Sequence, residues 1–178
     1  TPTIAVVGLL DDADRHAVSH WTRAGLTIVL LGETREELGG SEWLALRRGL
    51  EAGLPPRVDL AHERRLQALL AETIAGGLVP TAHDVGSGGL AVALAECGFS
   101  GPAALRIGCR VEFGGRLRVD VQLFGESTGR VLIACEDADA VLARARAAGV
   151  PARRIGTTGG DRVVIGAVGH PAWIDTAV

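Results

Sequence analysis

The sequence contains no methionine, lysine, asparagine or tyrosine, so all 18 of its basic residues are arginines. A shortage of deamidation-prone residues is typical of heat-adapted or GC-rich sources and carries no functional information. Because the 178 residues contain no methionine at all, we expect them to be a fragment of a longer chain or a processed product. Their length suits a single domain over 1–178.

Other shortages exclude whole classes of protein. No apolar run approaches the roughly 18 residues that cross a bilayer. Eighteen basic against 21 acidic residues, without a basic run, argue against nucleic-acid binding. The three cysteines form neither an even disulfide set nor a close-spaced metal site. They are typical of small buried groups in a reducing compartment, so we expect a cytoplasmic protein.

Short apolar runs predict the strands, because strands that are buried on both faces lack clean alternation. The predicted strands lie at residues 3–10, 26–31, 79–85, 103–111, 129–135 and 162–168. Residues 117–124 alternate like a strand, but their length also allows a short helix.

Helices are predicted from capping residues and from apolar residues at helical spacing. The predicted N-terminal caps are Ser41, Asp59, Ser87 and Asp137, and glycines at 53, 76 and 149 end the first, second and fourth helices. The alternation of strands and helices indicates an α/β (α+β) fold, in which a mixed β-sheet is packed with helices.

The stretch from Ala82 to Glu96 (AHDVGSGGLAVALAE) combines a strand end, a glycine-rich turn and a helix of small residues. Free amides at such a helix start attract anions, and glycines let a phosphate approach the backbone. Asp84 would repel a phosphate, so a nucleotide in this turn would require Mg²⁺ on the carboxylate. The alternative is that Gly88 and Gly89 only let the helix pack closely while Asp84 caps the turn, and spacing alone favours it.

A second cluster, FGESTGR at residues 124–130, precedes another predicted strand. Glu126 could accept hydrogen bonds from ribose hydroxyls or share a metal, and Ser127 or Thr128 could donate to a ligand. Arg130 could pair with a phosphate or with Glu126. The structural alternative, which the sequence alone favours, is a Glu–Arg pair that fixes a tight turn.

The charged, glycine-bounded loop at residues 31–42 (LGETREELGGSE) either docks against another domain or is an ordinary solvated loop. The histidines at 16, 20, 62, 83 and 170 show no metal-ligand spacing.

Four stretches together resemble one family in their order and spacing: residues 2–10 (PTIAVVGLL), 30–43 (LLGETREELGGSEW), 82–96 and 123–130 (LFGESTGR). The chain resembles the last carboxy-terminal domain of phosphoribosylformylglycinamidine synthase (formylglycinamide ribonucleotide amidotransferase) of the smaller bacterial type. That family belongs to the aminoimidazole ribonucleotide synthetase superfamily. The resemblance spans nearly the whole chain.

The resemblance implies a domain of an ATP-dependent carbon–nitrogen ligase of purine biosynthesis. This enzyme uses glutamine-derived ammonia to convert formylglycinamide ribonucleotide to the amidine, with ATP and Mg²⁺ as cofactors. It has two similar halves, and this chain matches the second carboxy-terminal domain, whereas the catalytic histidine lies in earlier domains. The implied partners are the preceding domains, a glutaminase and a small accessory subunit. Alone, the chain would be structural or would bind an auxiliary nucleotide, without catalytic residues of its own.

By position, the resemblance places Asp84 at a magnesium-binding aspartate, and Glu126 and Ser127 at substrate contacts. The expected nucleotide or substrate pocket comprises His83, Asp84, Gly88, Gly89, Glu126, Ser127 and Arg130. The sequence departs from the family pattern where Gly86–Ser87 replaces a serine and an acid, and where Gly125 and Thr128 replace a serine and a glutamine. The loss of one carboxylate and one amide favours a scaffold role.

Two alternatives differ in class. The aminoimidazole ribonucleotide, selenophosphate and thiamine-phosphate enzymes share the domain shape, although the motif at 32–41 argues against them. The other alternative is a free-standing module that binds a small molecule.

Overall fold

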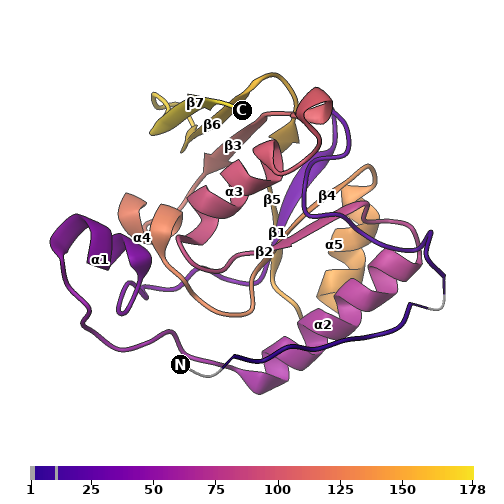
Figure 1. The fold of residues 1–178 in the computed structure, drawn as a ribbon, viewed down its shortest axis with the longest axis horizontal. Helices are drawn as coiled ribbons and strands as arrows, with labels where there is room; N and C mark the ends of the chain where they lie inside the picture. The colour runs from indigo at the N-terminus through magenta and orange to yellow at the C-terminus, as the bar shows by residue number, and fades with distance from the viewer. Residues whose placement is uncertain (1–2, 11) are drawn as a thin grey trace.

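The computed structural model describes residues 3–10 and 12–178, which form one mixed seven-stranded sheet with helices on both faces (Figure 1). The strands are β1 (Thr27–Leu31), β2 (Thr81–Asp84), β3 (Cys109–Phe113), β4 (Val131–Cys135), β5 (Ala152–Thr158), β6 (Arg162–Ala167) and β7 (Ile174–Ala177). The helices are α1 (Glu42–Arg48), α2 (Leu60–Ala75), α3 (Gly89–Phe99), α4 (Val119–Phe124) and α5 (Ala138–Ala147), with a 3₁₀ turn η1 at Ala103–Leu105. The predicted fold class is confirmed.

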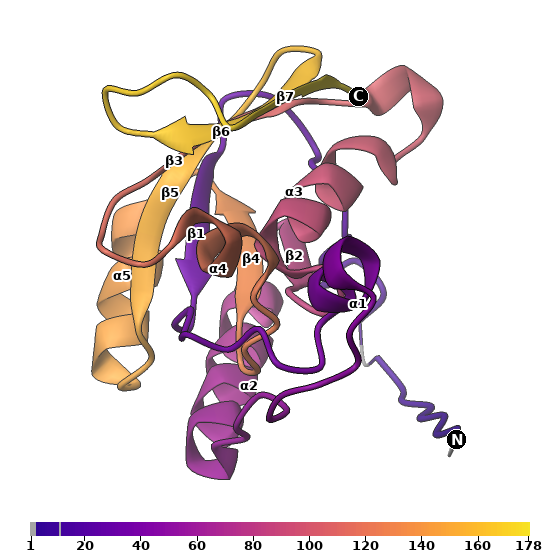
Figure 2. The same ribbon diagram turned by 90° about the vertical axis from the view of Figure 1, so that its left-hand side faces the viewer.

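The strand order is β2-β4-β1-β5-β3-β6-β7. The β3–β6 pair is parallel, and the other neighbouring pairs are antiparallel. Helices α3 and α4 lie on one face, and α2 and α5 cover part of the other. Figure 2 shows the sheet between α3 and α5.

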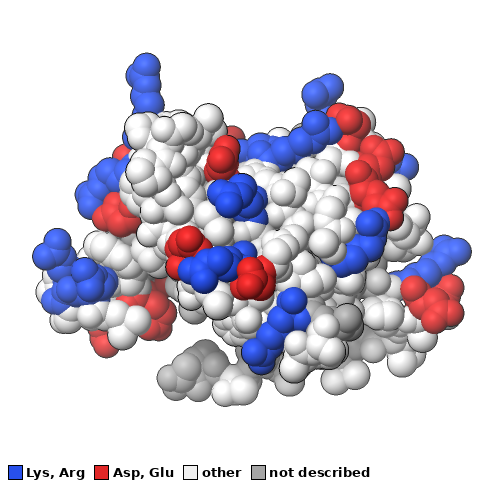
Figure 3. Space-filling view, turned by 90° about the horizontal axis from the view of Figure 1, so that it is seen from above, with Lys and Arg blue, Asp and Glu red and all other residues white. Residues whose placement is uncertain are grey.

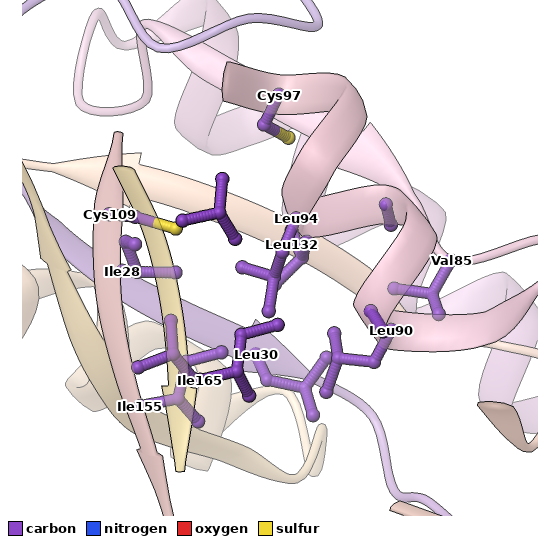
Figure 4. Packing of buried hydrophobic residues seen from close by; sticks show 14 of the residues in the cluster. Ile28, Leu30, Val85, Leu90, Leu94, Cys97, Cys109, Leu132, Ile155 and Ile165 are labelled. Atoms are coloured by element: carbon purple, nitrogen blue, oxygen red, sulfur yellow. The ribbon is translucent and has the colours of Figure 1, made fainter. Parts of the chain in front are cut away.

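Strand β1 is buried on both faces, which explains its uninterrupted apolar sequence. Ile28 and Leu30 belong to the core beneath α3, whereas Val29 and Leu31 belong to the core beneath α2 and α5. Figure 4 shows Leu90 of α3 packed toward the side chains of the sheet. The core beneath α3 therefore positions the start of α3 and the glycine-rich turn that precedes it.

Three of the predicted helix caps, Ser41, Asp59 and Asp137, are confirmed. At the start of α2, Oδ1 of Asp59 accepts the N–H groups of Ala61 and His62, each at 3.0 Å. Oδ1 of Asp137 accepts the N–H of Ala140 at 2.9 Å and starts α5. Each aspartate satisfies amides that lack a partner within the helix.

Three predictions are wrong: the strand at residues 3–10, the end of the first helix and the cap of the third helix. Residues 3–10 form no strand and are exposed, because no neighbouring strand supplies hydrogen bonds to them. Helix α1 ends at Arg48, where Gly49 adopts a left-handed conformation, and not at Gly53. Helix α3 is capped by Gly88, also left-handed, and not by Ser87.

The remaining differences concern strands. The predicted strand at 103–111 begins only at Cys109, after the 3₁₀ turn η1. Residues 117–124, for which strand and helix were both open, contain helix α4. Strands β5 and β7 were not predicted, because β5 contains two arginines and a glycine and β7 is a four-residue edge strand. Their hydrogen bonds come from the neighbouring strands β1, β3 and β6.

No helix within the described residues is both long and apolar enough to span a membrane. Seen from above, the face in Figure 3 carries basic and acidic side chains interspersed rather than one continuous basic surface. This mixture agrees with the near balance of charge in the sequence.

Candidate functional site

The glycine-rich turn connects the end of β2 to α3 and packs against the end of α4. Gly88 and Gly89 have φ angles of +79° and +69°, which side chains rarely adopt. A methyl group on Gly89 would lie 2.7 Å from the carbonyl oxygen of Gly125 and 2.8 Å from that of Leu123. The glycines therefore allow a close approach between two segments of backbone, and this geometry supports their packing role.

The carboxylate of Glu126 occupies the position at which the sequence suggested a bound anion. Its Oε1 accepts the N–H of Gly88 at 2.9 Å and the N–H of Glu42, the first residue of α1, at 2.9 Å. A carboxylate at two helix starts is favoured by the unpaired amides and by the helix dipoles. Glu126 thus connects α1 to the turn before α3. The N–H of Gly88, one of the amides that the sequence suggested for binding a phosphate, already has a hydrogen-bond partner.

Arg130 is buried and holds the FGESTGR turn together. Its guanidinium donates to the carbonyl oxygens of Ser127 (2.8 Å) and Gly125 (2.6 Å) and to the hydroxyl of Thr34 (3.1 Å). Burial lowers the pKa of Arg130 to about 10, which leaves the side chain charged at neutral pH. Within the described residues, no ion pair joins Arg130 to Glu126. The prediction of a Glu–Arg pair is therefore wrong. The guanidinium of Arg130 donates to the backbone carbonyl oxygens of Ser127 and Gly125 instead.

The loop at residues 31–42 docks against the same turn within this chain. The fully buried hydroxyl of Ser127 accepts the N–H of Arg35 at 3.0 Å. Oε1 of Glu37 accepts the N–H of Arg57 at 3.1 Å, which attaches the loop to the segment that leads into α2. Ser127 is thus used in folding, and the two motifs form one hydrogen-bonded unit.

His83 and Asp84 lie at the end of β2, apart from this buried network. The Asp84 side chain is 87% exposed, whereas that of His83 is 15% exposed. Nδ1 of His83 donates to the Asp84 carbonyl oxygen at 2.6 Å, and its Nε2 lies 3.5 Å from Oε2 of Glu96 on α3. Asp84 is therefore the carboxylate of the predicted set that remains free to meet a ligand from outside.

The donor set does not make a complete magnesium site. Among the described residues, no group of three or more histidines, cysteines, aspartates or glutamates is placed to hold a metal ion. Magnesium in nucleotide sites is usually bound by one or two carboxylates together with phosphates and water. Asp84 by itself matches one ligand of such a site, and no chemical step is assigned to this chain through the metal.

A feature that the motif analysis missed is the aromatic contact at the start of α1. The rings of Trp43 and Phe124 are stacked, with centroids 6.3 Å apart and an interplanar angle of 21°. The pair borders a groove of about 530 Å³ that also includes Gly88, Leu46 and Val92. The presence of Trp43 in one motif and Phe124 in the other was a signal that the two motifs meet.

Residues 23–168 match the family described as "AIR synthase related protein, C-terminal domain". The chain belongs to this family. The match includes the glycine-rich turn, Glu126 and the α1 region, so the hydrogen-bonded unit lies wholly within the AIR synthase related domain.

Two curated relatives are named "Phosphoribosylformylglycinamidine synthase subunit PurL". The protein from Moorella thermoacetica is 46% identical over 167 residues, which is 93% of this chain and 22% of the relative. The protein from Symbiobacterium thermophilum is 49% identical over 134 residues, which is 75% of this chain and 17% of the relative. The chain thus spans about a fifth of the length of these relatives.

Solved structures share the fold of this AIR synthase related domain at low identity. "T. maritima PurL complexed with FGAR" has a TM-score of 0.79 at 21% identity and covers 93% of this chain and 29% of its own. "Hydrogenase Maturation Protein HypE in complex with ATP" has a TM-score of 0.62 at 20% identity, covering 93% of this chain and 54% of its own.

Proposed function

We propose that this chain is the carboxy-terminal domain of a phosphoribosylformylglycinamidine synthase, within a single polypeptide that contains further domains. The parent would be an ATP-dependent ligase of purine biosynthesis that converts formylglycinamide ribonucleotide to the amidine with glutamine-derived ammonia. The observation that carries this proposal is the 46% identity to a PurL subunit across 93% of the chain. The low coverage of that relative, 22%, is the reason to assign the chain a domain's role.

Within the parent, the chain's role is to support the fold and to line an auxiliary nucleotide pocket. Asp84, Gly88, Gly89 and Glu126 line that pocket, and the other domains close it. Exposure of the Asp84 carboxylate supports a role as one magnesium ligand. The hydrogen bonds of Glu126, Ser127 and Arg130 support a scaffold role, because each of these side chains already connects segments of this chain.

The expected partners are the preceding domains, a glutaminase and a small accessory subunit in the cytoplasm. Support for an assembly comes from a solved structure titled "Structure of PurLQS from Thermotoga maritima", which shares this fold with a TM-score of 0.69. Copurification of the full-length parent with its own glutaminase, with and without this domain, tests the partnership.

The test of the activity uses the full-length parent. With formylglycinamide ribonucleotide, ammonia and Mg·ATP, we expect release of ADP and formation of the amidine, and we expect neither from the 178-residue chain alone. A parent that consumes no formylglycinamide ribonucleotide would contradict the proposed reaction, and turnover by the chain alone would contradict its supporting role.

Titration calorimetry with Mg·ATP tests the pocket. In the full-length parent, Asp84→Asn should weaken binding of the auxiliary nucleotide without lowering the unfolding temperature, because this side chain is exposed. Asp161→Asn, also exposed, is the matched control and should bind like the unaltered parent. Binding tighter than millimolar by the chain alone would show that the pocket does not need the other domains.

A further inference from the structure

Arg153, near the start of β5, has no acidic partner. It pairs with Leu30 across the sheet, so both side chains lie on the face that carries α3 and α4. Its guanidinium lies 5.7 Å from the centroid of the Phe113 ring. Among the described residues, no ion pair joins Arg153 to a carboxylate. The next residue, Arg154, faces the opposite side of the sheet and forms an ion pair with Asp139 at 2.6 Å. Of these two neighbouring charges, only that of Arg154 is neutralised by such a pair.

Arg153 lines a cavity of about 540 Å³ next to α4. The segments that follow β1 and β3, the start of β5 and one side chain of α4 surround this cavity. Pockets that hold small molecules usually have volumes of about 300–1,000 Å³. The lining shares no residue with the proposed auxiliary nucleotide pocket. We call it the Arg153 cavity, and its lining includes Glu33, Thr34, Gly115, Gln122 and Arg153.

The other polar groups of the Arg153 cavity are hydrogen-bond donors with capacity left. Gln122 is only 5% exposed, and its Nε2 donates one N–H to the carbonyl oxygen of Leu117 at 2.7 Å. The second N–H of this amide has no acceptor among the described residues. The hydroxyl of Thr34 accepts from Arg130 at 3.1 Å and keeps its own O–H to donate. The backbone N–H of Gly115 also lacks an acceptor in the part of the chain that the structure describes. Because buried polar groups are usually hydrogen-bonded, the free N–H of Gln122 indicates a place for a ligand oxygen.

The charges around the Arg153 cavity favour an anion. The Arg153 side chain is exposed, yet the surrounding protein displaces enough water to lower its pKa. Burial lowers the pKa of Arg130 most, the carboxylate of Glu37 raises it, and the charge of Arg153 lowers it again. The two guanidinium groups are therefore close enough to repel each other, and an anion in the cavity would offset that repulsion. Glu33 also lines the cavity, but it is exposed, so water and salt screen its effect on an anion.

We propose that the Arg153 cavity binds the phosphate group of a small phosphorylated molecule. A guanidinium can donate two parallel hydrogen bonds to a phosphate. The amide of Gln122 and the hydroxyl of Thr34 would donate to the remaining oxygens. A phosphate group presents three acceptor oxygens and a carboxylate two, so donors that come from several directions favour phosphate. The cavity is larger than a phosphate group and has room for the rest of the molecule. This inference goes beyond the proposed function and does not rest on it.

Modification of arginines by phenylglyoxal in the full-length parent tests the proposal without any substitution. The rate at each residue is followed by peptide mass spectrometry, with nucleotides omitted and with inorganic phosphate, acetate or chloride at equal ionic strength. At a phosphate concentration of about ten times the Kd, occupancy should slow the modification of Arg153 about tenfold. Arg154, which is already paired with Asp139, is the reference and should react equally fast with and without phosphate.

Three results of this experiment would overturn the proposal. Arg153 that reacts equally fast with and without phosphate means that the cavity binds no phosphate. Equal slowing of Arg153 and Arg154 means that phosphate only screens charge. Equal protection by acetate means that the cavity takes any oxyanion and does not select a phosphate group.

A matched pair of variants of the full-length parent gives a second measurement. Arg153→Gln and Arg154→Gln each remove one positive charge from adjacent exposed positions of β5, so both should fold. In calorimetric titrations with inorganic phosphate, we expect Arg153→Gln to weaken binding at least about tenfold, because a charge-assisted hydrogen-bond pair is lost. Arg154→Gln should bind phosphate like the unaltered parent, and equal affinities of the two variants would overturn the proposal.

Ligase activity of the unaltered parent separates this proposal from the proposed function. An active ligase in which phosphate does not protect Arg153 refutes only the phosphate site. An inactive parent in which phosphate protects Arg153 refutes the proposed function and supports the phosphate site.

Discussion

Oε1 of Glu126 lies 2.9 Å from the backbone nitrogen of Gly88 and accepts its N–H. The same oxygen accepts the N–H of Glu42 at 2.9 Å. One carboxylate therefore connects the starts of two helices that are separated by 38 and 84 residues from it along the chain. This relationship shows that a motif with the composition of a ligand site also connects parts of the fold.

Replacing this carboxylate should weaken both helix starts. Glu126→Gln keeps the shape but removes the charge, so we expect a loss of about 1–2 kcal/mol in the free energy of unfolding. Urea denaturation of the chain measures the change. Glu112→Gln, at an exposed position of β3, is the control and should be within about 0.5 kcal/mol of the unaltered chain. Equal stability of the two variants would show that the Glu126 contacts contribute nothing.

Gly89→Ala should be much more damaging than Gly77→Ala. Both glycines have positive φ, so each alanine carries a strain of about 1–2 kcal/mol. The methyl group at residue 89 would additionally lie 2.7 Å from a carbonyl oxygen, whereas the position at 77 is open. We expect Gly89→Ala to cost at least about 2 kcal/mol more, by the overpacking it forces. Thermal unfolding of the pair is the measurement, and similar unfolding temperatures would refute the close approach of α3 to the end of α4.

Arg130→Lys should destabilise the chain although the charge is kept. The guanidinium donates in three directions, to Ser127, Gly125 and Thr34, and an ammonium cannot match that geometry. We expect a loss of about 2–3 kcal/mol because buried acceptors lose their partners. Arg118→Lys is the control, because the Arg118 side chain is 72% exposed. If both lysine variants unfold at the same urea concentration, Arg130 does not hold the turn.

The buried thiols should make the chain less stable at high pH. Burial raises the pKa of Cys109 to about 12 and that of Cys135 to about 11, from an ordinary value of 9.0, and it also raises the pKa of Cys97. Between pH 9 and 11 the unfolded chain releases protons that the folded chain retains. The contribution of the buried, protonated Cys135 thiol to the free energy of unfolding is therefore present below pH 9, and it is lost as the pH rises through 11.

Urea denaturation between pH 8 and pH 10.5, with pH as the variable, checks this expectation. Cys135→Ala removes one of the three thiols and should show a shallower decline of stability with pH. Iodoacetamide should label the native chain slowly at pH 8, because the thiolate is the nucleophile. A decline that is equally steep in Cys135→Ala would mean that this thiol does not contribute.

Local signals in the sequence predicted the elements whose cause is local. The apolar run of β1 and the aspartate caps of α2 and α5 depend on residues within a few positions, and the structure confirms them. The apolar run at 3–10 looks the same as β1 in sequence, yet it forms no strand. A strand is stabilised by its neighbours, and whether a neighbour exists is decided far along the chain.

The site shows the same division. The sequence identified Asp84, Gly88, Gly89, Glu126, Ser127 and Arg130 as unusual. It left open whether they bind a ligand or hold the fold. That question depends on hydrogen bonds such as those from Arg35 to Ser127, 92 residues apart, which no local pattern contains.

By itself, the sequence determined the apolar run of β1, the caps at Ser41, Asp59 and Asp137 and the positions at which glycine allows close approach, because propensity, capping and burial period act over a few residues. Only the tertiary structure decided that Glu126 bonds to the starts of two helices and that Leu46 of α1 remains exposed. Those outcomes depend on which surfaces meet, and that is settled by packing of the whole chain.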